Sequence, residues 1–162
     1  MRRIVILLIL QIIATGFCFG QLPHTFTQYT SEDGLSQNTI MSILQDDKGV
    51  MWFATWDGLY KFDGYTFNNY KAHPGDSIGL SNNRLDNIKE DRYGYIWVQS
   101  YNHQVYRFNP RLERFQAIPY DNYLSLDMYV LPCGDVWIIT VQNELIHIST
   151  HPETHEMKAT DF

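Results

Sequence analysis

The chain has 162 residues, which suits one ordinary domain and hardly two. Its 12 basic and 18 acidic side chains give a formal net charge of −6, and the bases form no cluster. Because nucleic-acid binding requires a basic surface, this charge argues against a nucleic-acid partner.

The first 20 residues have the layout of a secretory signal peptide. Arg2 and Arg3 precede the apolar run IVILLILQIIA, which is too short and too early in the chain for a membrane-spanning helix. The small Gly20 stands before Gln21, so we expect cleavage after Gly20 and export to the periplasm. The net charge would then become −8, because two bases leave and no acid does.

A rival interpretation of this leader is a lipoprotein signal with Cys18 as the lipidated residue. Phe17 argues against it, since the position before a lipidated Cys normally carries a small side chain. Once Cys18 is removed, Cys133 has no partner for an intrachain disulfide. No second long apolar run follows the leader, so the sequence predicts no membrane span in the mature chain.

An internal repeat organises the rest of the chain. Three segments align: SQNTIMSILQDDKGVMWFAT from Ser36, SNNRLDNIKEDRYGYIWVQS from Ser81, and SLDMYVLPCGDVWIIT from Ser125. A Gly-x-x-Trp core recurs in them as Gly49-Trp52, Gly94-Trp97 and Gly134-Trp137. After each Trp a second matching segment follows, and these segments align at Leu59, Val105 and Leu145 if the second and third copies carry one extra residue.

Each repeat is interpreted as four short strands joined by tight turns. In the first copy the strands are expected at Ile40–Leu44, Val50–Ala54, Gly58–Phe62 and Thr66–Tyr70. No window shows helical periodicity with caps. Successive Trp residues lie 45 and 40 residues apart, and four-stranded units of this length are typical of β-propeller blades. The predicted fold class is therefore all-β, a partial β-propeller of about three four-stranded blades after an N-terminal signal peptide.

The predicted organisation is a signal peptide at residues 1–20, a lead-in segment at 21–35, and blades at 36–72, 81–118 and 122–162, the third of them degenerate. A blade packs both faces against its neighbours, which explains why the strands are apolar runs without clean alternation. The three repeated Trp side chains are expected to fill the space between adjacent blades as structural core.

The first copy, LSQNTIMSILQDDKGVMWFATWDGLYKFDG, resembles the two-component regulator propeller repeat. It contains an Asn-x-Ile strand, Asp-x-x-Gly, Trp-x-x-Thr, and Gly-Leu before a short strand, and the preceding YTSEDGLS resembles the lead-in to a first blade. The third copy departs from the pattern: Leu131 replaces the turn Asp, and Asn143-Glu144 replaces Asp-Gly.

In that family, tandem propellers form the periplasmic sensor of hybrid two-component histidine kinases, and they often detect breakdown products of complex polysaccharides. The resemblance implies that this chain is an N-terminal fragment of such a sensor. It implies a binding module for an oligosaccharide, without a kinase domain, a catalytic residue or a cofactor in this chain.

Trp56, Tyr101 and His103 are the candidate ligand-binding residues. They fall in the same hairpin of neighbouring blades, where loops at one end of a propeller gather. Aromatic faces there can stack on a sugar ring, and polar neighbours can add specificity. The alternative is that these side chains only cap the boundary between two blades.

The remaining clusters of His, Asp and Glu are explained by their place in turns and strands. His147, His151 and His155 are spaced by four, but Pro152 prevents a helix that would bring them together, so we predict no metal site. The carboxylates of Asp46-Asp47 and Glu90-Asp91 recur in the same turn of successive blades, where such groups accept backbone hydrogen bonds. We therefore predict no catalytic residue.

Two other functions remain open from the sequence. In the first, the chain is a secreted binding module whose blades close by self-association. In the second, the chain is part of a propeller enzyme that acts on glycans. The first follows from the count of three blades, because closed propellers have typically four to eight. The second requires acidic side chains that converge on a central channel, and the sequence offers none in register.

Overall fold

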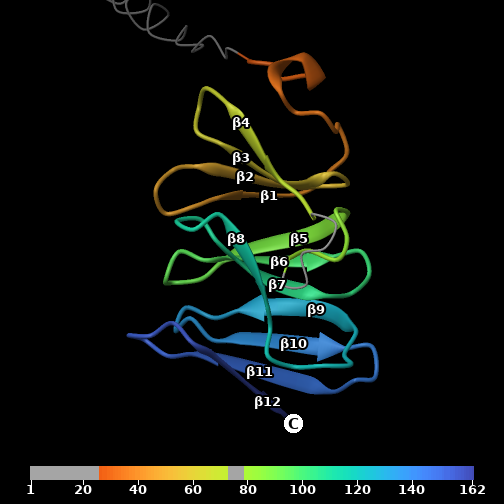
Figure 1. Cartoon of the computed structure of the whole chain (residues 1–162), viewed down its shortest axis with the longest axis vertical. Helices are drawn as coiled ribbons and strands as arrows, with labels where there is room; N and C mark the ends of the chain where they lie inside the picture. Colours follow the sequence, from red (N-terminus) through yellow and green to blue (C-terminus); the bar gives the residue numbers. More distant parts are fainter. Residues whose placement is uncertain (1–25, 73–78) are drawn as a thin grey trace, which may run out of the picture.

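The computed structural model describes residues 26–72 and 79–162. The expected signal peptide, with Cys18 and the cleavage point after Gly20, lies outside these residues. Figure 1 shows three sheets that follow one another along the long axis of the molecule, with the first sheet at one end and the C-terminus beyond the last.

Each sheet is an antiparallel blade of four strands, hydrogen-bonded in chain order. Blade 1 comprises β1 (Ile40–Gln45), β2 (Met51–Thr55), β3 (Gly58–Phe62) and β4 (Phe67–Tyr70). Blade 2 comprises β5 (Leu85–Glu90), β6 (Ile96–Ser100), β7 (Val105–Asn109) and β8 (Arg114–Ala117). Blade 3 comprises β9 (Ser125–Val130), β10 (Val136–Thr140), β11 (Leu145–Thr150) and β12 (Met157–Asp161). A 3-10 helix, η1 (Ser31–Asp33), precedes β1, and the prediction of an all-β partial propeller is confirmed.

The central hairpin of blade 1 is one residue shorter than the corresponding hairpins of blades 2 and 3. The strand register shows this directly when equivalent pairs are compared: Ala54 pairs with Leu59 across four intervening residues, whereas Gln99 pairs with Val105 and Ile139 with Leu145 across five. The extra residue that the sequence alignment required is therefore present in the second and third copies.

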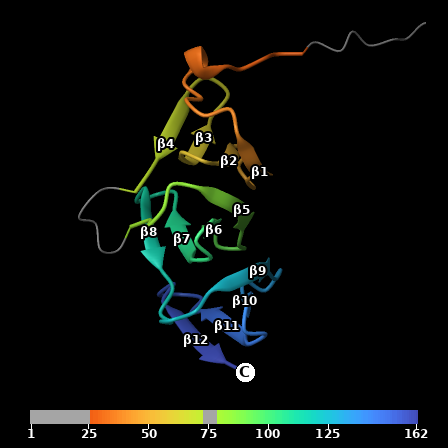
Figure 2. The same cartoon turned by 90° about the vertical axis from the view of Figure 1, so that its right-hand side faces the viewer.

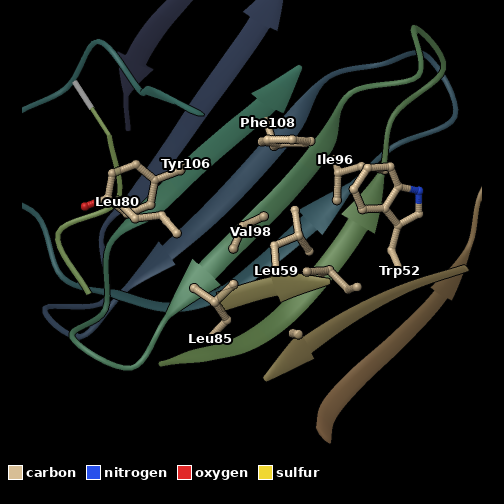
Figure 3. Packing of buried hydrophobic residues seen from close by; sticks show 10 residues of the cluster. Trp52, Leu59, Leu80, Leu85, Ile96, Val98, Tyr106 and Phe108 are labelled. Atoms are coloured by element: carbon tan, nitrogen blue, oxygen red, sulfur yellow. The ribbon is translucent and has the colours of Figure 1, made fainter. Parts of the chain in front are cut away.

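The hydrophobic core lies between the blades. Residues of blade 1, including Trp52 and Leu59, pack against residues of blade 2, including Ile96 and Phe108 (Figure 3). The Trp97 side chain does the same between blades 2 and 3, where it packs against Ile138 and other residues of blade 3. Blades 1 and 2 thus each turn a tryptophan toward the blade that follows, and blades 2 and 3 turn Ile side chains of β6 and β10 toward the blade before. Figure 2 shows the same order of the three blades from a second side.

Each buried tryptophan is fixed by the turn that precedes it. The indole Nε1 of Trp52 donates to Asp46 Oδ2 at 2.9 Å, and that of Trp97 donates to Asp91 Oδ2 at 2.8 Å. The Gly of each Gly-x-x-Trp core lets the turn close, because Gly49, Gly94 and Gly134 have φ angles of 82°, 78° and 95°. The repeat motif therefore encodes a turn that aims its tryptophan at the next blade.

The third repeat Trp differs from the expectation that all three are buried core. Trp52 and Trp97 are 1% and 0% exposed, whereas Trp137 is only half-buried. Its ring stacks on His147 with centroids 4.6 Å apart, and the Phe162 ring lies 5.6 Å away. The reason is positional, since Trp137 lies on the face of blade 3 that no described residue covers with another sheet.

We predict that Trp52→Ala and Trp97→Ala each lower the free energy of unfolding by about 3–5 kcal/mol, because each removes a fully buried indole from an interface between blades. Trp137→Ala should cost clearly less, since its ring already contacts solvent. Soluble yield and urea denaturation of the three variants measure the difference. Equal damage at all three positions would contradict this account of the blade faces.

Candidate functional site

The β2–β3 and β6–β7 hairpins lie beside each other at one end of blades 1 and 2, which we call the hairpin end. In the first of them, Thr55 Oγ1 accepts the Asp57 N–H at 3.0 Å and donates to the Gly58 carbonyl at 3.0 Å. The Gly58 N–H donates to the Asn83 carbonyl at 2.8 Å, so the hairpin is tied to blade 2. A Cβ on Gly58 would lie 2.5 Å from the Tyr70 carbonyl oxygen, so only glycine fits there.

Trp56 and Tyr101 follow β2 and β6 at the tips of these hairpins, and they are 42% and 52% exposed. Arg84, which directly precedes β5, extends its side chain between them. The guanidinium carbon lies 4.0 Å from the ring centroid of Trp56 and 3.8 Å from that of Tyr101. The structure therefore brings two of the three predicted ligand-binding residues together, with a cation stacked between their rings.

Sequence reasoning identified the two rings and missed Arg84. The strand register makes Ile40, Leu85 and Ser125 equivalent, so the positions equivalent to Arg84 are occupied by Thr39 and Leu124. Because neither of these is charged, the repeat pattern carries no signal for a cation at this position. The one sequence feature that pointed to it was a basic residue directly before the first strand of a blade, β5.

The Arg84 backbone is held on both sides. Its N–H donates to Asn82 Oδ1 at 2.8 Å, and its carbonyl accepts the Tyr101 N–H at 2.8 Å. The side-chain Nε is buried and has no hydrogen-bond partner in the described part of the chain. Neither of the two ion pairs found among the described residues, Lys71–Asp57 and His147–Asp135, involves the Arg84 guanidinium.

His103, the third predicted residue, is also exposed but is engaged elsewhere. It adopts a left-handed conformation with φ 64° in the five-residue hairpin. Its Nδ1 lies 2.9 Å from the Ser125 carbonyl oxygen, and its own carbonyl accepts the Ser125 N–H at 2.8 Å. His103 thus links blade 2 to the first residue of β9 and lies beside the aromatic pair without stacking on it.

A polar network holds Asp57, the residue that follows Trp56. The Asp57 carboxylate accepts hydrogen bonds from Lys71 Nζ and from Ser36 Oγ, and Ser36 also contacts the Tyr60 hydroxyl. Burial alone would raise the Asp57 pKa, but the hydrogen bonds from Lys71, Ser36 and Tyr60 and the Lys71 charge together lower it. Asp57 is therefore held ionised and neutralises Lys71.

A second concave feature lies at the opposite end of the blades, among the turns β1–β2, β5–β6, β7–β8 and β11–β12. This groove has a volume of about 430 Å³, and its lining includes Glu90, Arg92, Tyr93, Tyr95, Arg111 and His155. The pKa of the Glu90 carboxyl is raised, because burial disfavours its charge and the carboxylates of Asp47, Asp46 and Asp91 repel it.

The turn carboxylates near this groove are occupied by the backbone. Asp46 Oδ1 accepts the N–H groups of Lys48 and Val50, and Glu90 Oε2 accepts the Asp47 N–H at 3.0 Å. Asp91 Oδ1 accepts two turn N–H groups in the same way as Asp46. Asp46 and Asp91 thus accept N–H groups of their own turns, as the sequence predicted, whereas Glu90 accepts an N–H group from the turn of blade 1.

The three histidines spaced by four lie on β11 and in the turn that follows it. His147 Nε2 lies 3.0 Å from Asp135 Oδ2, and His151 Nδ1 accepts N–H groups of its own turn. Within residues 26–72 and 79–162, no group of three or more His, Cys, Asp or Glu side chains is placed to hold a metal ion. Over the same residues, no helix is long and apolar enough to cross a membrane.

Comparison with known proteins finds similarity to a propeller-repeat family and to sensor proteins. The family described as "Two component regulator propeller" matches residues 34–57, which include β1, β2 and Trp56. Histidine kinase P4 of Formosa agariphila is 48% identical over 56 residues, a match that covers 35% of this chain and 4% of that protein.

Two solved structures from B. thetaiotaomicron, both extracellular domains assigned to hybrid two component systems, share the fold. The first superposes with a TM-score of 0.65 at 24% identity and covers 84% of this chain and 20% of that one. The second has a TM-score of 0.58 at 20% identity and covers 74% of this chain and 18% of that one. The chain therefore spans a small part of the length of each relative.

We predict that Glu90→Gln raises the melting temperature modestly at pH 7. A carboxyl whose pKa is higher in the folded than in the unfolded state destabilises the fold when ionised, and an amide removes that charge. The gain should shrink as the pH falls through the raised pKa, because the native Glu90 then takes up a proton itself. Thermal unfolding of both proteins between pH 7 and pH 4 measures this, and a gain that does not change with pH would contradict it.

Proposed function

We propose that this chain is a member of the two component regulator propeller family and that it supplies blades to the exported, ligand-sensing propeller of a hybrid two-component sensor. We further propose that the ligand is a fragment of a glycan. The relatives support the placement in a sensor, and the apolar leader with Arg2 and Arg3 at its start supports export.

The observation that carries the glycan proposal is the cluster of Trp56, Arg84 and Tyr101 at the hairpin end. Sugar recognition commonly combines aromatic surface, which contacts the C–H groups of the ring, with a few fixed polar groups. Here two exposed aromatic side chains flank a cation, and the Arg84 backbone carbonyl accepts the Tyr101 N–H.

The position of this cluster also suggests how binding is converted into a signal. Trp56 belongs to blade 1, whereas Arg84 and Tyr101 belong to blade 2. A ligand that contacts both blades stabilises their relative orientation, and a ligand shifts a conformational equilibrium by its difference in affinity between the two states. The role is non-catalytic, since the turn carboxylates are committed to backbone hydrogen bonds.

The end face of blade 3 supports a proposal about partners. Trp137 pairs across the sheet with Tyr129 and His147, so the three side chains share one face. Tyr129 is 51% exposed and Phe162, beside Trp137, is 72% exposed. Because the equivalent faces of blades 1 and 2 each bury a tryptophan against the next blade, we propose that this face receives a further blade of the same kind.

We predict that the purified chain binds oligosaccharide fragments weakly through the hairpin end, and that Trp56→Ala and Tyr101→Ala each reduce the affinity about tenfold or more. Titrations followed by NMR, with melting curves for each variant, measure affinity and folding separately. Tyr65→Ala is the matched control, because Tyr65 is 92% exposed in the β3–β4 turn at the other end of blade 1. An equal loss in the control, or none in the two site variants, would contradict the proposal.

We also predict that the isolated chain self-associates through its uncovered blade face, since apolar surface that a blade normally buries is exposed there. Trp137→Lys should reduce the concentration dependence of sedimentation, and Tyr65→Lys should leave it unchanged. A wild-type chain that sediments as a compact monomer at all concentrations would show that the face needs no partner blade.

A further inference from the structure

We propose that the Arg84 guanidinium at the hairpin end binds the oxyanion of an acidic sugar, either the carboxylate of a uronic acid or a sulfate ester. The inference rests on the proposed function and deepens it, because it concerns the same site. It changes the expectation drawn from the sequence, in which the aromatic faces of Trp56 and Tyr101 themselves stack on the sugar.

The stacking of Arg84 excludes a sugar from the space between the two rings. The guanidinium carbon lies 4.0 Å from the Trp56 centroid and 3.8 Å from the Tyr101 centroid, so both faces of the guanidinium are covered. What remains for a ligand is the N–H edge in the guanidinium plane, bordered on each side by an exposed aromatic ring. This edge donates hydrogen bonds and accepts none.

Arg84 lacks the partners that a structural arginine has in this protein. Arg107 also stacks on a ring, with its guanidinium carbon 4.3 Å from the Tyr95 centroid. Arg107 is 3% exposed, however, and its Nη2 donates to Gln116 Oε1 at 2.7 Å and to the His155 carbonyl at 2.8 Å. Arg84 is half-buried, and its guanidinium donates to no acceptor in the described part of the chain.

The chemistry of this edge selects an oxyanion. A guanidinium presents parallel N–H donors whose spacing matches the two oxygens of a carboxylate or a sulfate. Since the stacking rings and the bonded backbone already fix Arg84, little side-chain freedom is lost on binding. Lys71 is neutralised by Asp57, the residue after Trp56, whereas Arg84 has no carboxylate partner among the described residues and is available for such a ligand.

The surroundings explain why the ligand is a sugar that carries the anion and not a free anion. The chain is acidic overall, with a net charge of −6, so any anion is repelled at long range, and a free anion has only its contact with Arg84 to offset that repulsion. The exposed parts of Trp56 and Tyr101 add apolar contacts that only a carbon-bearing ring can use.

The test titrates the purified full chain with four probes: a disaccharide that contains a uronate, a disaccharide that carries a sulfate ester, the neutral parent disaccharide, and inorganic sulfate. The indole N–H signal of Trp56 in NMR spectra is the readout. At least one acidic disaccharide should bind about tenfold more tightly than the neutral one, with an affinity that falls as salt is added. The preference between the two acidic probes identifies the source of the oxyanion.

Arg84→Lys keeps a positive charge but removes the paired donors, and Arg84→Met removes both. The acidic disaccharide should lose about tenfold in affinity with Arg84→Lys and more with Arg84→Met, while the neutral disaccharide is hardly affected. Arg111→Met, at the groove on the opposite end, is the control and should bind normally. If Arg84→Met lowers the melting temperature, the affinity of Arg84→Lys is used instead. An Arg84→Lys variant with an unchanged melting temperature and an about tenfold loss of affinity for the acidic disaccharide supports the inference, and one with unchanged affinity contradicts it.

Equal affinity for acidic and neutral disaccharides, with Trp56→Ala still harmful, would overturn this inference and leave the proposed function standing. Inorganic sulfate that binds as tightly as the sulfated sugar would also overturn it, since the site would then recognise an anion alone. Failure of all sugars to bind at the hairpin end would contradict both the inference and the proposed function.

Discussion

The contact on which the rest of the structure depends is the burial of a tryptophan between successive blades. Trp52 and Trp97 each fill such an interface, and Asp46 and Asp91 hold their indole N–H groups in place. Blades that are four short strands wide have little core of their own, so this contact sets the spacing and the orientation of the blades. The positions of the connecting hairpins follow from that spacing.

The hairpin-end site is a consequence of the same interface. Trp56 and Tyr101 belong to different blades, and they can clamp Arg84 only because blade 2 is seated against Trp52. The clamp converts two exposed rings and a flexible cation into one preorganised group. The proposed binding role of this clamp and its position across a blade boundary are therefore linked, because a ligand bound here would contact both blades.

The sequence predicted the elements well and their surroundings less well. The Gly-x-x-Trp repeat placed the blade 1 strands within about one residue of β1 to β4, because turn chemistry and strand patterns are local. It did not reveal that Trp137 is half-buried, since burial there depends on a neighbouring sheet. Arg84 was missed because a cation–π contact between blades has no signature in the repeat, and the orientation of His103 depends on its left-handed backbone.

The Arg84 edge, bordered by Trp56 and Tyr101, is the proposed binding site of an acidic sugar. A crystal structure of the chain soaked with its best-binding acidic disaccharide tests this most directly. We expect electron density for the oxyanion within hydrogen-bond distance of the Arg84 guanidinium, with the sugar ring against one of the two aromatic side chains. Density for the sugar in the groove beside Glu90 and Tyr93, with an empty hairpin end, would contradict the account.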